Sequence, residues 1–101
     1  MVKSSLFAIG PLFMTAGVSA ACGEDPVFTQ FLNHSIRRHL NGDWGELSAE
    51  DQESNAQALV NGGRIFSVYK PLFTIGKYSD KIWVITEADR SSTTVLFPSE
   101  Y

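Results

Sequence analysis

The chain contains one cysteine, Cys22, and two histidines, so it lacks the residues for an internal disulfide or a four-ligand zinc site. It also lacks an excess of positive charge, because 8 lysine and arginine residues stand against 11 aspartate and glutamate residues. The formal net charge of -3 gives no general attraction to phosphate backbones or anionic lipid. We therefore expect no metal or other cofactor, no direct nucleic-acid binding and no membrane association.

No stretch has the roughly 20 mostly apolar residues that a membrane span needs. The nearest candidate is the N-terminus, where Lys3 precedes an apolar run over residues 6–18 and small residues follow at 18–20. This order is typical of a secretory signal, although Gly10 and Pro11 interrupt the run. The residues alone leave two alternatives open, a signal cleaved from residues 1–20 and a segment retained in the fold.

The composition that remains is that of one folded domain over residues 1–101, with 44% hydrophobic and 12% aromatic residues. An extended segment hinged at Gly10 and Pro11 precedes a short helix over residues 16–22, which Thr15 caps and Gly23 ends. A second helix starts at Pro26. Its apolar stripe, spaced by three and four residues, is Phe28, Phe31, Leu32, Ile36 and Leu40. Its last turn carries cations that complement the helix dipole, Arg37, Arg38 and His39.

A third helix follows Ser48, whose side chain can cap it, with Asp51 at the position of a short capping box. Ala56, Leu59 and Val60 are expected to form its buried face, and residues 61–63 (Asn-Gly-Gly) end it. The remaining sequence changes to strand periodicity in three segments, residues 64–70, 81–87 and 93–97.

The sequence thus predicts an α+β fold, with three short-to-medium helices packed on a small antiparallel sheet of three to four strands. Residues 88–92 form a hairpin loop between the last two strands. Residues 71–80 form a longer connection, whose Leu72, Phe73 and Ile75 are expected to fold back onto the body.

Several blocks of the sequence resemble a group of small uncharacterised proteins encoded on bacterial plasmids and other mobile elements. The most specific block begins at Trp83 and runs to Tyr101, within KIWVITEADRS and TTVLFP. A second block is RHLNGDWGEL at residues 38–47. The chain departs from the pattern at Ala16, where proline is usual, around residues 34–37 and in the longer loop at residues 72–80. The other matching positions are 6–10, 14–17, 31–32, 50–51, 55, 58–59, 63–64, 67 and 69.

The resemblance carries implications for compartment and setting. The similar proteins keep the block at residues 6–17 as part of the domain, which implies a cytoplasmic protein that retains its N-terminus. It implies a mobile-element setting and no established activity.

Two polar turns are candidate sites. The turn at residues 42–45 could present Trp44 to a partner, or Asp43 could cap it while Trp44 packs beneath. The hairpin loop brings together Glu87, Asp89 and Arg90, which could serve a small, possibly hydrolytic enzyme as an acid/base group. The alternative is a structural loop in which Arg90 pairs with one of these acids.

His39 is a weaker candidate for a general base oriented by Asp43, since no nucleophile accompanies the pair. The alternative is that a protonated His39 caps the end of its helix. Cys22 has no basic neighbour that would lower its pKa, so an inert buried thiol is expected.

The segment around the third helix start is acidic, with five carboxylates in eleven residues and no base between them. Such a surface could complement a basic groove on another protein, or it could be a solvated helix start. We expect a non-enzymatic binding protein, a monomer or homodimer, that inhibits a host defence complex of the CRISPR or restriction type. The acidic residues are Asp43, Glu46, Glu50, Asp51 and Glu53.

Overall fold

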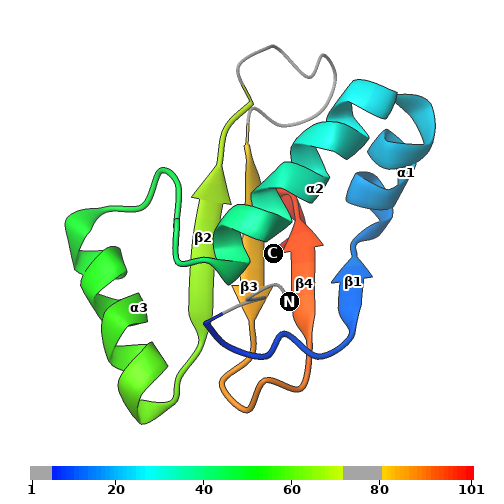
Figure 1. Ribbon diagram of the computed structural model, residues 1–101. Coiled ribbons are helices and arrows are strands. Elements are labelled where there is room, and N and C mark those ends of the chain that lie inside the picture. Colours follow the sequence, from blue (N-terminus) through cyan, green and yellow to red (C-terminus); the bar gives the residue numbers. More distant parts are fainter. Residues whose placement is uncertain (1–5, 72–80) are drawn as a thin grey trace, which may run out of the picture.

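A computed structural model describes residues 6–71 and 81–101 (Figure 1). Three helices cover and flank a four-stranded sheet, and a short 3-10 turn, η1, ends the chain. The α+β class expected from the sequence is confirmed. In chain order the elements are β1 (Leu12–Met14), α1 (Ala16–Glu24), α2 (Pro26–Leu40), α3 (Ala49–Asn61), β2 (Ile65–Tyr69), β3 (Ile82–Thr86), β4 (Thr93–Leu96) and η1 (Pro98–Glu100).

The sheet has the strand order β1-β4-β3-β2 and is mixed. Strands β2, β3 and β4 pair antiparallel, with Val84 of β3 opposite Ser67 on one side and Val95 on the other. Strand β1 pairs with β4 in parallel, so the N-terminal segment adds a fourth strand beside the last one. The sequence pattern predicted the three antiparallel strands within one or two residues at each end, but it carried no signal for the parallel pairing.

Helix α2 lies across one face of the sheet, and α1 packs beside it (Figure 1). The buried residues of α2, Phe28 and Leu32, join Val84 and Val95 in the main core. Val18 and Ala21 of α1 are also fully buried and belong to this core, whereas Leu6, Leu12, Phe13 and Met14 are exposed. The N-terminal segment therefore contributes to the core through α1, and through β1 it contributes a strand.

Helix α1 differs from expectation at both ends. It continues through Gly23 to Glu24, and Asp25 then begins α2 by accepting a hydrogen bond from the N–H of Val27. Thr15 occupies the N-cap position, but its hydroxyl donates to Glu100 instead of bonding to the helix. Glu100 also accepts from the N–H of Gly17, so a carboxylate from the other end of the chain caps α1.

Helix α3 lies beside β2 at one edge of the sheet (Figure 1). Its start is as predicted, because the Ser48 hydroxyl accepts from the N–H of Asp51. The predicted buried face is wrong. Val60 is 82% exposed and Ala56 is also exposed, whereas Asn55 and Ala58 face inward with Leu59 partly buried. The reason is that the Asn55 amide bonds to the backbone of β2 and fixes the helix rotation, which apolar spacing alone could not reveal.

Two glycines sit where another residue would clash. At Gly45 the backbone has φ 73° and pairs with Val68, whose carbonyl oxygen would lie 1.9 Å from an added Cβ. At Gly10, with φ 62°, the N-terminal segment passes so close to the hairpin that a Cβ would lie 2.7 Å from the carbonyl oxygen of Arg90. The expected folding-back of Leu72, Phe73 and Ile75 lies outside the described residues.

Candidate functional site

The side chains of the turn at residues 42–45 bond and pack within the protein, so little of their surface is free to contact a partner. Asp43 accepts two hydrogen bonds from Arg38, at 2.7 and 3.0 Å, and these bonds hold the pKa of its carboxyl below the usual value. Trp44 is only 9% exposed and packs against the rings of Phe7 and His39. The Tyr69 hydroxyl donates to the Asp43 carbonyl and closes the turn from below.

His39 corrects two expectations. It is fully buried, so it does not act as a protonated cap of α2, and Asp43 bonds to Arg38 and does not orient it. Its Nδ1 and Nε2 bond to the hydroxyls of Ser67 and Thr86. Burial lowers the pKa of His39 to about 4, so the ring is neutral at physiological pH.

The charged residues of the hairpin loop do not converge on one site, because each makes its own interactions. The Arg90 backbone has φ 61°, and its guanidinium reaches across to the end of α3. No salt bridge between described residues joins Arg90 to Glu87 or Asp89. Asp89 is exposed and accepts from the N–H of Ser91, which stabilises the turn. The guanidinium donates to four main-chain carbonyls, those of Ala58, Gly63, Glu87 and Ala88.

The acidic segment is spread over more than one surface. Asp43 is paired in its turn, and the N–H of Glu46 bonds to β2 while its side chain is exposed. Glu53 lies two residues beyond Asp51, which places it on nearly the opposite side of α3, and there it accepts from Gln57. Glu50 and Asp51 occupy the first turn and are both exposed. Asp51 is the one of the five acids that lines the groove between α3 and the sheet.

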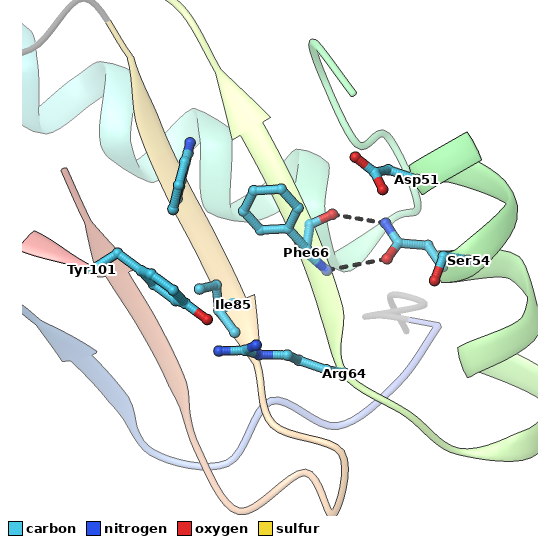
Figure 2. A pocket seen from close by; sticks show the side chains of 8 residues that line it. Asp51, Ser54, Arg64, Phe66, Ile85 and Tyr101 are labelled. Atoms are coloured by element: carbon cyan, nitrogen blue, oxygen red, sulfur yellow. Dashed lines mark hydrogen bonds between the residues drawn. The ribbon is translucent and has the colours of Figure 1, made fainter. Parts of the chain in front are cut away.

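This groove has a volume of about 390 Å³ and is lined by residues of α3 and of the sheet face that points away from α2 (Figure 2). Side chains alternate along strands, so Phe66 and Ile85, which are register partners, share this face while their neighbours point toward α2. In Figure 2, Asp51 and Ser54 come from α3 on one side and Tyr101 approaches from the other. The lining residues are Asp51, Ser54, Asn55, Arg64, Phe66, Trp83, Ile85 and Tyr101.

Three aromatic rings form a row along the groove, each set nearly at right angles to the next. The Phe66 and Trp83 centroids are 5.2 Å apart with an interplanar angle of 87°, and those of Trp83 and Tyr101 are 5.5 Å apart at 67°. Phe66 and Trp83 are partly buried and Tyr101 is 69% exposed. Rings at right angles present both faces and edges to the space between them, which gives the groove apolar walls with a preference for cations over the ring faces.

Opposite charges stand at different places on the rim. The Arg64 guanidinium lies 5.5 Å from the Tyr101 ring centroid, and Asp51 lies on the α3 side (Figure 2). The one salt bridge between described residues is that of Arg38 and Asp43, so Asp51 and Arg64 have no ionic partner in the described part of the chain. Asn55 uses its amide on the backbone of Phe66 and therefore supports the groove without offering a free polar group.

Sequence reasoning identified Asp51 but missed the aromatic residues of the groove. Phe66 lay unremarked within a predicted strand, and Trp83 and Tyr101 appeared only as the two ends of a block of resemblance. A usable signal was present. Phe66 and Trp83 each occupy a strand position that alternates with residues of the α2-facing side, and the register of β2 and β3 places both rings on the face away from α2.

The described residues contain no group of three or more metal-ligating side chains, and none of their helices combines the length and apolarity of a membrane span. No family model, curated protein or solved structure matches the chain. The geometry of the groove is therefore the main guide to function.

Proposed function

We propose that this protein is a small non-enzymatic binding protein and that the groove between α3 and the sheet is its contact surface. The observation that carries this proposal is a row of three aromatic rings lying partly open beside Asp51, a carboxylate that forms no salt bridge with any residue the structure describes. Aromatic residues that sit in a pocket with polar groups at its rim are the usual anchors of protein interfaces.

We further propose that the partner is the basic surface of a host defence complex and that the protein inhibits it in the cytoplasm, as a mobile-element product of the anti-CRISPR or anti-restriction type. The support is the net charge of -3, the exposed acids at the start of α3, and the resemblance to mobile-element proteins. The burial of Val18 and Ala21 supports retention of the N-terminal segment.

The arrangement of the side chains in the hairpin loop favours a binding function over catalysis. Arg90 is committed to main-chain carbonyls, and Asp89 stands exposed at the loop, so the groups do not face a common reacting position. His39 is buried and saturated by two hydroxyls.

The proposal predicts where a partner will crosslink. A photoreactive phenylalanine analogue placed at Ser54, on the groove, should capture one specific host protein when cells of the native host are irradiated. The same analogue at Val60, on the same helix but 82% exposed and away from the groove, is the matched control. The measurement is the crosslinked band and its identity by mass spectrometry.

Equal capture from both positions, or none from Ser54 when the protein is present at its native level, argues against the groove as an interface. A defence function further requires that the captured protein belong to such a complex and that its nuclease or interference activity fall when this protein is added.

A further inference from the structure

We propose, resting on the binding function above, that the groove receives a single basic side chain of the partner, an arginine or lysine, with its alkyl stem on the aromatic row and its cation at Asp51. A volume of about 390 Å³ is near the lower end for ligand pockets, which are about 300–1,000 Å³, so it suits a long side chain and not a folded element.

The apolar part of the groove fits the stem of such a side chain. Ile85 and Phe66 are paired on adjacent strands and lie in the lining together with Trp83. Lysine and arginine carry three or four methylene groups that pack on apolar surface while their charged ends remain near water. The perpendicular rings place ring faces beside the path of the cation, where their quadrupoles attract it.

The polar end of the groove selects the sign of the charge. Asp51 forms no salt bridge with any described residue, and Ser54 adds a hydroxyl one helical turn away. The positive end of the α3 dipole would oppose a cation there, but two carboxylates in the first turn, Glu50 and Asp51, offset it. A guanidinium can bond to both oxygens of a carboxylate, which favours arginine over lysine.

Arg64 explains why the groove admits only one cation from the partner, at the Asp51 end. Its guanidinium already lies over the Tyr101 ring, which shows that this aromatic row accommodates a stacked cation. A second positive side chain beside it would meet repulsion from a like charge. The partner sequence should therefore carry an isolated basic residue, followed by a neutral or acidic residue on the side nearest Arg64.

Blocked pentapeptides with one central residue test this inference by NMR titration of the ¹⁵N-labelled protein. Each probe has arginine, norleucine or glutamate at its centre and only alanine and glycine at the other positions. The arginine peptide should shift the Trp83 indole and the Ser54 amide, with affinity about fivefold above that of norleucine, the size of an exposed ion pair. The buried indole of Trp44 is the internal control and should not move.

Two substitutions at exposed positions give opposite expectations. Asp51→Asn should lower the affinity for the arginine peptide about fivefold, to the level of norleucine. Arg64→Gln should leave that affinity unchanged or raise it, because a like charge is removed. The inference is overturned if the glutamate peptide binds best, if Asp51→Asn has no effect, if norleucine equals arginine, or if no peptide shifts the groove.

The proposed host interface and the proposed occupant of the groove can be disproved independently of each other. Undiminished crosslinking of a host protein from Ser54 in the Asp51→Asn variant would keep the groove as the interface and remove the basic side chain as its occupant. Absence of any crosslinked partner, with arginine-selective peptide binding intact, would keep the chemistry of the groove and remove the proposed host interaction.

Discussion

His39 lies within a buried chain of hydrogen bonds that fixes its tautomer. The Thr93 hydroxyl donates to the carbonyl of Ile9, so it must accept from Thr86, and Thr86 in turn accepts from Nε2–H of His39. Nδ1 is then an acceptor, and the Ser67 hydroxyl donates a hydrogen bond to it. Each donor in the chain is used once. A second proton on the ring would remove the acceptor at Nδ1 and reverse the Ser67 hydroxyl.

This chain makes stability depend on pH in a defined window. Burial lowers the pKa of His39 from 6.5 to about 4, so between these values the unfolded chain binds a proton that the folded protein excludes. Stability is full above pH 6.5 and falls as the pH drops toward 4, by a total of about 3 kcal/mol. Urea unfolding followed by tryptophan fluorescence at pH 7.5, 6, 5 and 4 measures the loss.

A His39→Gln variant is the control, because its amide can donate and accept as the neutral ring does but does not titrate. The variant should lose the dependence between pH 6.5 and 5, where the carboxyl groups with lowered pKa, such as Asp43, have not begun to protonate. A wild-type curve that is flat through this window would mean that the ring is hydrated in the native protein.

At the scale of the elements, the two edges of the sheet differ. The outer edge of β2 is sealed, since Asn55 bonds to the N–H and C=O of Phe66, and Val68 bonds to Trp44 and to Glu46. At the other edge β1 has an apolar surface, and Phe13 is 55% exposed. The pairing leaves every second backbone group of β1 directed outward. An open edge is compatible with either a monomer or a twofold dimer, the alternatives expected from the sequence.

Replacing the residue that seals β2 should have two effects. Asn55→Leu leaves the N–H and C=O of Phe66 without partners in a partly buried position, at a cost of about 2–3 kcal/mol. It also exposes a strand edge that can pair with another chain. Thermal unfolding measures the first effect, and size-exclusion chromatography over a range of protein concentrations measures the second.

The same substitution on the exposed side of α3, Gln57→Leu, serves as the comparison and should change stability by no more than about 0.5 kcal/mol. If the two variants are equally stable and equally monomeric, the amide of Asn55 does not protect the edge.

The elements show how far the sequence could lead. Strand composition and the turn formers predicted β2, β3 and β4, and Pro26 and Ser48 predicted two helix starts, because these signals act within a few residues. The rotation of α3 depends on an amide that reaches a strand 11 residues away. The groove depends on residues from α3, two strands and the C-terminus, which only the tertiary fold assembles.

For the whole molecule, one carboxylate near residue 101 bonds to the start of the first helix, in addition to the pairing of β1 with β4. Glu100 accepts from the Thr15 hydroxyl, the N–H of Gly17 and the N–H of Phe97. Partial burial acts to raise its pKa, but these three bonds outweigh it and hold the pKa below the usual value. The carboxylate therefore stays charged at neutral pH, where it complements the positive end of α1.

Glu100→Ala should cost about 1 kcal/mol, the usual loss on removing a helix N-cap. It should also speed amide hydrogen exchange in the first turn of α1, at Gly17 and Val18, more than in α2. Ser99→Ala, at the exposed neighbouring position, should do neither. Equal exchange in both variants would show that Glu100 does not hold the start of α1.

This arrangement has a consequence for synthesis. Strand β1 is made first, but it can pair only with β4, and the cap on α1 lies 85 residues further along the chain at Glu100. Until residues 93–100 have been made and have left the ribosome, the early segment has neither its neighbouring strand nor its cap. The pairing of β1 and the capping of α1 are therefore late steps in the folding of this domain, whichever residues of the chain order first.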